Sequence, residues 1–386
     1  MVAYKYFSCD DHLTEAPDTY TKRLPSRFKE VVPHIETLDG TDMWVAEGAP
    51  ITAAVRTGSL VGLPRNGPRG DFRLQKATFD NVRPGVWKPQ DRLNDYDTGG
   101  VYGAILFPDF LPGFTGNPYW SLKDMDLRRA CIKAYNDRLI EEFSAVDPKR
   151  FIPLCIFPVW SIQEAVEEVN RCAKLGYKGV CWGGLVDIYG YPWMGDPYWY
   201  PLWEAIQDTD MVLSLHQQSA AIDRIKIEPG ITPANLNAAI GSSHLTSMIQ
   251  PTQELLISGI LERFPKMRVL IAEGGVGWIP FILQLGDRNH QTGDPLKNSR
   301  TENFQRQCIA GFWHERVDDY VLDICGAHTI CWEQDYPHPL TIWPDCDESI
   351  EFSMANVKGQ ALRQDLLWGN VARHFKLDVE GVFPTT

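Results

Sequence analysis

The feature that most constrains this fold is a regular alternation of short apolar runs with longer segments of helical spacing. Runs at residues 101–107, 151–157 and 211–215 are mainly apolar, and amphipathic stretches such as 161–175 alternate with them. Short buried strands that alternate with helices are typical of a parallel sheet, because parallel strands need long crossover connections. With a first run at residues 4–7, the chain holds about eight such units, which predicts a closed (β/α)8 barrel of the TIM type.

An open, doubly wound sheet is the alternative arrangement of these units. It is less favoured because no G-x-G-x-x-G motif follows a predicted strand in the setting that dinucleotide binding requires. The chain has 386 residues, of which 44% are hydrophobic, so it is long enough for one large barrel with an insertion. We therefore expect a single domain over residues 1–386.

Residues 17–98 interrupt the alternation. Pro and Gly recur throughout this stretch, and we expect it to be largely irregular. Its aromatic residues, which include Trp44, Phe79 and Trp87, argue against disorder. We predict an insertion that folds over the mouth of the barrel or packs on a neighbouring subunit.

Charge and cysteine usage exclude several classes of protein. The formal net charge is -13 and no basic block occurs, which argues against nucleic acid and anionic membranes as partners. No apolar stretch approaches the roughly 20 residues that a membrane span needs, and the N-terminus lacks the pattern of a signal peptide. The nine cysteines form no C-x-x-C pair, so neither a disulfide framework nor a thiolate zinc site is indicated. We expect a cytoplasmic enzyme with a small-molecule substrate.

Polar residues follow several of the predicted strands at the point where each strand ends. They are Asp10, His12, His216, Glu273 and Asp335. The carboxyl ends of barrel strands converge on one mouth, and residues two apart on a strand, such as Asp10 and His12, share a face. Imidazoles and carboxylates together suit zinc, manganese or iron, and the lack of thiolates argues against a structural zinc site.

Each of these residues also has a structural explanation when taken alone. Asp10 could cap a helix whose capping box is completed by Glu15, and His216 could bond a carbonyl group in the core. Glu273 could cap the next helix, and Asp335 could form an Asx turn. Their joint occurrence at strand ends favours a shared metal site, whereas Glu15 is interpreted as structural.

Four further residues are candidates for contact with the substrate: Trp278, His338, His244 and Tyr189. His338 lies in the loop after the last strand and fits a structural role equally well. His244 is a loop histidine. Tyr189 belongs to an aromatic stretch after the fourth strand, which either stacks on a flat substrate or packs the rim of the barrel.

Several segments resemble the amidohydrolase-2 family, in the branch that includes aminocarboxymuconate semialdehyde decarboxylase and the resorcylate-type decarboxylases. The resemblance extends over nearly the whole chain. It is carried by Asp10-x-His12, His216, Val269–Trp278, Trp332–Pro339 and Trp368–Arg373.

The resemblance implies a distorted (β/α)8 barrel that holds one divalent metal ion, with zinc as first choice and manganese or iron as alternatives. The ligands it implies are Asp10, His12, His216 and Asp335. Decarboxylases of the family usually carry a histidine before the paired glycines of the sixth strand, where this chain has Glu273. The first motif is Asp-x-His instead of His-x-His, which leaves the identity of the metal open.

Metal-dependent hydrolysis is the leading hypothesis for the activity. A metal-activated water would attack a small cyclic or aromatic substrate, with Glu273 or Asp335 as the base and His216 in the catalytic set. The alternative is a carboxy-lyase, which would remove CO2 from an aromatic or unsaturated acid without oxidation. A metal-free binding module on the same barrel is the third possibility. We also expect a homodimer or a larger homo-oligomer.

Overall fold

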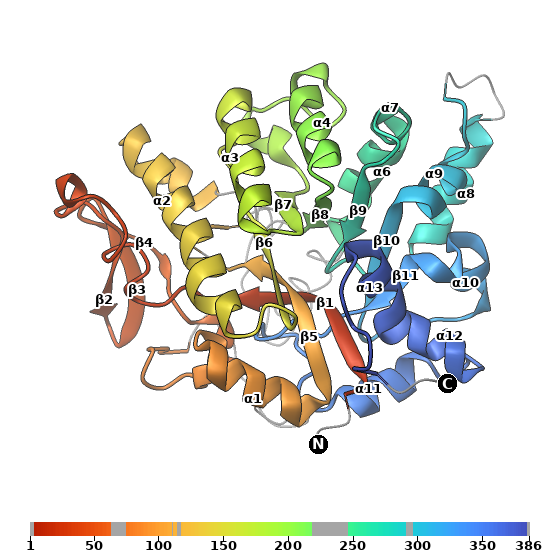
Figure 1. The fold of residues 1–386 in the computed structure, drawn as a ribbon, viewed down its shortest axis with the longest axis horizontal. Helices are drawn as coiled ribbons and strands as arrows, with labels where there is room; N and C mark the ends of the chain where they lie inside the picture. The colour runs from red at the N-terminus through yellow and green to blue at the C-terminus, as the bar shows by residue number, and fades with distance from the viewer. Residues whose placement is uncertain are drawn as a thin grey trace, which may run out of the picture.

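The computed structural model describes residues 4–62, 75–109, 111–113, 117–217, 246–290 and 296–383. Eight parallel strands form one sheet, in which each strand lies beside the next barrel strand along the chain (Figure 1). These strands are β1 (Tyr6–Leu13), β5 (Val101–Pro108), β6 (Phe151–Cys155), β7 (Gly179–Gly183), β8 (Val212–His216), β9 (Arg268–Ile271), β10 (Cys308–Phe312) and β11 (Ile330–Trp332).

The two ends of this sheet meet, so the barrel is nearly closed. The backbone N–H of Asp335 donates to the carbonyl of Asp10 at 3.0 Å, and that of His12 donates to the carbonyl of Tyr336 at 2.6 Å. We call this pairing of β1 with residues 334–336 the seam. The predicted (β/α)8 barrel is confirmed.

Helices surround the strands in Figure 1. They are α1 (Pro89–Gly99), α2 (Met125–Arg138), α3 (Ile162–Leu175), α4 (Tyr200–Asp208), α6 (Ile249–Ile257), α7 (Ile260–Arg263), α8 (Ile279–His290), α9 (Arg300–Gln307), α10 (Asp319–Cys325), α11 (Cys346–Ser353), α12 (Gln360–Gln364) and α13 (Asn370–Phe375). Two π-helical segments, Leu139–Phe143 and Asp365–Gly369, extend α2 and join α12 to α13. None of the helices in the described ranges combines the length and hydrophobicity that a membrane span requires.

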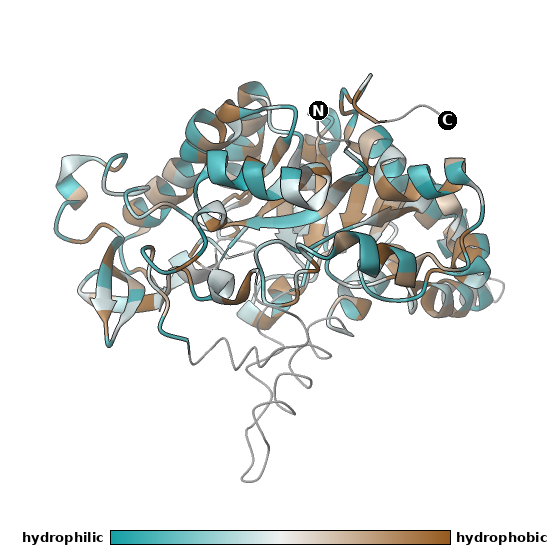
Figure 2. Ribbon diagram, turned by 90° about the horizontal axis from the view of Figure 1, so that it is seen from below, coloured by the Kyte–Doolittle hydropathy of each residue, from teal (hydrophilic) through white to brown (hydrophobic). Residues whose placement is uncertain are grey.

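The strands supply the core. Every residue of β5, β8 and β10 is buried, as expected for parallel strands that are covered by helices on the outside and by other strands' side chains on the inside. Figure 2 shows the strands at the centre as mainly hydrophobic, whereas the surrounding helices alternate between hydrophilic and hydrophobic residues. Helix α3 is capped at both ends, because Ser161 accepts the N–H of Glu164 and Gly176 ends the helix at a φ of 97°.

The structure differs from expectation within residues 17–98. This stretch contains α1 and an antiparallel sheet of β2 (His34–Leu38), β3 (Thr41–Ala46) and β4 (Ala49–Ala53), which Figure 1 places at one edge of the molecule. The connections are the two-residue turns 39–40 and 47–48, and all four of their residues have positive φ between 47° and 77°. Such turns match the twist of antiparallel hairpins, so an Asp-Gly and a Glu-Gly pair define this sheet.

Candidate metal centre

The predicted polar residues converge at the carboxyl end of the barrel. Asp10 and His12 lie on β1, His216 ends β8, Glu273 follows β9, and Asp335 follows β11. All of these side chains are buried, and so is His338. Their donor atoms lie within 4.8 Å of one another in two overlapping sets, which are Asp10, His12, His216 and Glu273, and His12, Glu273, Asp335 and His338. We call these six residues the cluster.

The two central imidazoles point their Nε2 atoms at each other. Nδ1 of His12 lies 2.8 Å from the carbonyl of Pro108, and Nδ1 of His216 lies 2.9 Å from the carbonyl of Gln217. Each carbonyl accepts a hydrogen from Nδ1, so Nε2 of each neutral ring carries a lone pair. The two Nε2 atoms are only 3.2 Å apart. A cation bound by both rings would satisfy both lone pairs.

The carboxylates of Asp10 and Asp335 complete this geometry. Nε2 of His12 lies 3.5 Å from an oxygen of each carboxylate, and Nε2 of His216 lies 3.5 Å from Asp10 Oδ2. Within the described residues, neither oxygen of either carboxylate accepts a hydrogen bond of normal geometry. A buried carboxylate without such partners is costly, because it has lost its hydration. Two imidazoles and two carboxylates therefore fit a divalent cation.

Glu273 reaches the same point from the sixth strand. Its Oε2 lies 3.1 Å from Nε2 of His216 and accepts a hydrogen bond of 3.1 Å from the side chain of Gln217. Glu273 has a φ of 48°, and Asp335 has a φ of 56°. Non-glycine residues rarely adopt this left-handed conformation, and residues that do so are concentrated at functional sites.

His338 joins the cluster through both of its ring nitrogens. Nδ1 lies 3.0 Å from Oδ1 of Asp335, and Nε2 lies 3.4 Å from Oδ1 of Asp109. The ring also stacks on His12 at 3.6 Å between centroids. His338 therefore lies within the cluster, beside Asp335, and this position is compatible with both a structural role and contact with a substrate.

Sequence reasoning missed Asp109. This buried carboxylate follows β5 directly, and it accepts hydrogen bonds from Thr14 at 2.5 Å and from Thr57 at 3.1 Å. Its position after the apolar run 101–107 and Pro108 was the same signal that identified Glu273 and Asp335. The signal was therefore present in the sequence.

The buried groups shift one another's pKa values. Burial lowers the pKa of His12 well below its usual value and raises the pKa of both Glu273 and Asp335. Burial also opposes the charge of His338, but Asp335 and Asp109 outweigh it and raise the pKa of this ring well above its usual value. These opposed shifts are expected where carboxylates crowd together and a cation would neutralise them.

The other three candidates for contact with the substrate, Trp278, Tyr189 and His244, are not among the six cluster residues. The indole N–H of Trp278 donates to the carbonyl of Gly274 at 2.6 Å, so this side chain supports the turn after β9. Tyr189 is partly exposed and packs edge-on against Trp120 at 4.7 Å between ring centroids. His244 lies outside the described residues.

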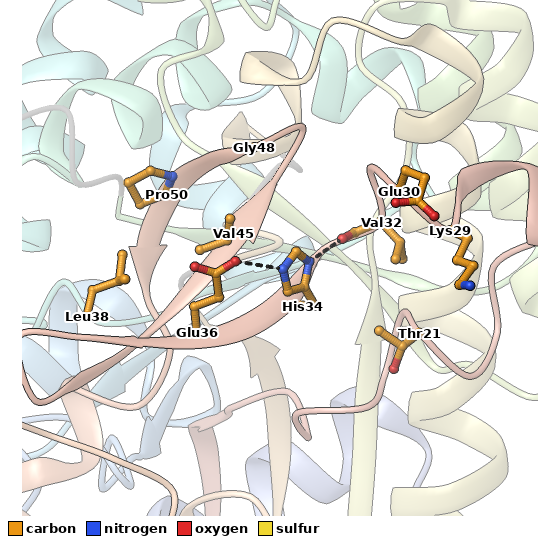
Figure 3. Close-up of a pocket in the computed structure, with 10 residues that line it drawn as sticks. All are labelled: Thr21, Lys29, Glu30, Val32, His34, Glu36, Leu38, Val45, Gly48 and Pro50. Carbon is orange, nitrogen blue, oxygen red and sulfur yellow. Dashed lines mark hydrogen bonds and ion pairs between the residues drawn. The ribbon is translucent and has the colours of Figure 1, made fainter.

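A separate cavity of about 460 Å³ opens on the small antiparallel sheet (Figure 3). His34 lies at its centre, between the carbonyl of Val32 at 2.8 Å and the carboxylate of Glu36 at 3.0 Å. No residue of the cluster lines this cavity, so it is distinct from the candidate metal centre.

Comparison with known proteins gives consistent results. A family model described as amidohydrolase matches residues 78–377. The chain is 24% identical to 2-amino-3-carboxymuconate-6-semialdehyde decarboxylase of Dictyostelium discoideum, over 78% of this chain and 80% of that protein. It is also 24% identical to gamma-resorcylate decarboxylase of a Polaromonas species, over 63% of this chain and 75% of that protein.

Solved structures show the same fold. An amidohydrolase from Mycobacterium avium subsp. paratuberculosis superimposes with a TM-score of 0.71 at 16% identity, covering 97% of this chain and 100% of that one. A dihydroxybenzoic acid decarboxylase from Polaromonas, solved with bound manganese and 2-nitroresorcinol, gives a TM-score of 0.61 at 16% identity, covering 97% of this chain and 98% of the other.

Proposed function

Because the chain belongs to the amidohydrolase family, we propose that it is a metal-dependent carboxy-lyase acting on an aromatic or unsaturated carboxylic acid. The observation that carries this proposal is the buried cluster, in which two imidazoles and two carboxylates with unsatisfied oxygens face one point. The similar curated proteins are decarboxylases, which favours this reading over hydrolysis, the leading hypothesis from the sequence.

We propose that Asp10, His12, His216 and Asp335 hold one divalent cation. Carboxylate and imidazole donors suit manganese, zinc or iron, and manganese is bound in one structurally similar decarboxylase. When bound, such a cation acts as a Lewis acid that orients the substrate carboxylate and a neighbouring oxygen. The protein's own part is to fix these four donors on three different strand ends.

Glu273 is proposed to handle the proton. When the bond to the leaving CO2 breaks, the carbon atom that carried it must receive a proton. Decarboxylases of this family usually carry a histidine at the position that Glu273 occupies here. Glu273 lies in the cluster without being needed as one of the four proposed ligands, and burial favours its protonated form. The carboxylic acid would thus replace the imidazole in the same position.

The segment 17–98 is proposed to border the mouth. Thr57 from this segment donates to Asp109 at the end of β5, and Arg92 donates to the carbonyl of His12 at 2.9 Å. These contacts attach the segment to β1, which carries the cluster residue His12, and to the end of β5, where Asp109 contacts His338. We further propose a cytoplasmic homodimer or larger assembly, which light scattering would test.

The proposed function is tested by metal analysis together with a substrate screen. Purified protein is assayed for bound manganese, zinc and iron, and then incubated with hydroxybenzoic and other unsaturated acids while released CO2 is measured. A parallel panel of amides, esters and lactones reports hydrolysis. We expect about one metal ion per chain and CO2 release. Turnover of the hydrolysis panel without CO2 release would restore the hydrolase hypothesis.

A further inference from the structure

The turn after β9 carries Glu273 in an unusual backbone conformation. Glu273 has a φ of 48° and Gly275 has a φ of 66°. A left-handed non-glycine residue is strained and persists only when its surroundings fix it. The hydrogen bonds of residues 273–278 therefore indicate what holds the Glu273 side chain towards the cluster.

Glu333 supports the start of this turn. Its Oε2 accepts the backbone N–H of Glu273 at 3.3 Å and the thiol of Cys9 at 3.6 Å, and the side chain is completely buried inside the barrel. Gly311 on the neighbouring strand β10 leaves the space that this carboxyl group occupies. A Cβ at position 311 would lie 1.9 Å from Oε2 of Glu333, so only glycine is compatible with this arrangement.

Glu315 supports the other end of the turn. Its Oε1 accepts the backbone N–H of Val276 at 2.7 Å, and its Oε2 accepts the N–H of Trp313 at 3.3 Å. A Cβ at Gly275 would lie 2.8 Å from Oε1, so the turn and the carboxylate are in close contact. Between the two ends, the indole of Trp278 donates to the carbonyl of Gly274.

We propose that Glu333 and Glu315 form a clamp that positions Glu273 for proton transfer. One acceptor comes from the end of β11 and the other from the segment after β10, so two neighbouring strands fix the turn that follows β9. Neither carboxyl group is among the six cluster residues. Both are positioning residues, because they act on the substrate only through Glu273. This inference rests on the proposed role of Glu273 in catalysis.

The first test compares Glu333→Gln with Glu333→Ala. Glutamine retains a carbonyl oxygen that can accept the N–H of Glu273, whereas alanine does not. We expect the alanine variant to lose about 100-fold in kcat with little change in KM, because a displacement of about 1 Å at a catalytic group has this effect. The glutamine variant should stay within about threefold of the parent chain. Equal losses in both variants would overturn the proposal.

Gly311→Ala gives a second test that leaves both carboxyl groups in the chain. The new methyl group displaces the Glu333 side chain, so kcat should fall as in Glu333→Ala. In the Glu333→Ala background the new methyl group no longer meets a carboxyl group, and its nearest remaining neighbour is Cys9 Sγ at 3.0 Å, so we expect a much smaller further loss. Additive effects of the two substitutions would show that Gly311 and Glu333 do not act through this contact. Glu315→Gln and Glu315→Ala provide the matched pair at the other end of the turn.

A readout that does not need activity separates this inference from the proposed function. Crystal structures of Glu333→Gln and Glu333→Ala report the distance from Glu273 Oε2 to His216 Nε2, which is 3.1 Å here. We expect this distance to persist with glutamine and to increase with alanine, while metal content stays at the parent level in both. An unchanged Glu273 in the alanine variant would overturn the clamp, whatever reaction the enzyme catalyses.

Discussion

At the scale of single residues, the proposed function divides the cluster into four residues that would hold a cation and one, Glu273, that would move a proton. Within the described residues, the buried carboxylate oxygens of Asp10 and Asp335 accept no hydrogen bond of normal geometry, and they lie beside imidazole nitrogens, as expected of metal ligands. Glu273 differs because Gln217 already donates to it. Substitution should therefore affect metal content and turnover differently at these positions.

Glu273→Gln should abolish turnover while metal binding is largely kept. The amide has the same shape but cannot exchange a proton at this position, and general acid–base catalysis contributes about 100- to 10,000-fold. Activity and metal content are measured on the same preparation. If the metal is lost together with activity, Glu273 is a ligand instead of the proton-handling group.

His374 gives a prediction about stability against pH. Burial, with help from nearby Arg268, lowers the pKa of this histidine to about 3. The unfolded chain takes up a proton near pH 6.5, and the folded chain does not until about pH 3. Stability is therefore lost as pH falls through this window, by at most about 1.4 kcal/mol per pH unit.

Urea unfolding from pH 7 to pH 4 measures this dependence. His374→Gln is the control, since it removes the titrating group, and its stability should fall less steeply over the same range. Parallel curves for the two proteins would show that His374 contributes nothing to the acid sensitivity.

At the scale of elements, one side chain of the hairpin of β3 and β4 binds the backbone just before α2. Glu47, in the turn 47–48, accepts the backbone N–H groups of Lys123 and Asp124 at 2.8 and 3.1 Å, just before α2 begins. Glu47→Ala should lower the free energy of unfolding by about 1 kcal/mol, because two N–H groups lose their acceptor. Denaturant unfolding checks this, and Glu47→Gln should keep most of the stability.

The sequence predicts the barrel strands more securely than it predicts tight turns and interruptions within helical segments. Eight apolar runs identified the barrel strands, because burial on both faces leaves a continuous hydrophobic signal. The small sheet was missed, since its strands are short, the outer two are partly exposed, and the turns 39–40 and 47–48 are its main signal in the sequence. The helical segment before β9 is divided into α6 and α7 at Gly259, which has a φ of 79°, and the apolar spacing of the sequence does not reveal this division.

The site was predictable where a polar residue stands at the end of an apolar run in the sequence. Asp10, His12, His216 and Glu273 lie where the apolar runs end, so the barrel topology alone brings them together. The clamp was not predictable in this way. Glu333 and Glu315 act through the side-chain space that Gly311 and Gly275 leave open, and such contacts depend on packing across strands.

At the scale of the whole molecule, a cation in the cluster would join the ends of β1, β8 and the segment after β11. We expect a chelator to lower the melting temperature by several degrees, because ligand binding to the folded state alone stabilises by about 2.7 kcal/mol at 100 times Kd. Differential scanning calorimetry with and without EDTA measures this shift. His216→Ala should melt at a lower temperature than the parent chain and should not respond to EDTA; an equal response would exclude His216 from the metal site.

The seam has a consequence for synthesis on the ribosome. Asp10 and His12 emerge first, but the backbone that closes the barrel beside them, residues 334–336, emerges more than 300 residues later. Until then β1 lacks one neighbour, and the early donors have no partner carboxylate from the far end. If Asp335 is a ligand as proposed, the nascent chain cannot assemble the complete ligand set, and metal binding follows translation of the last strand.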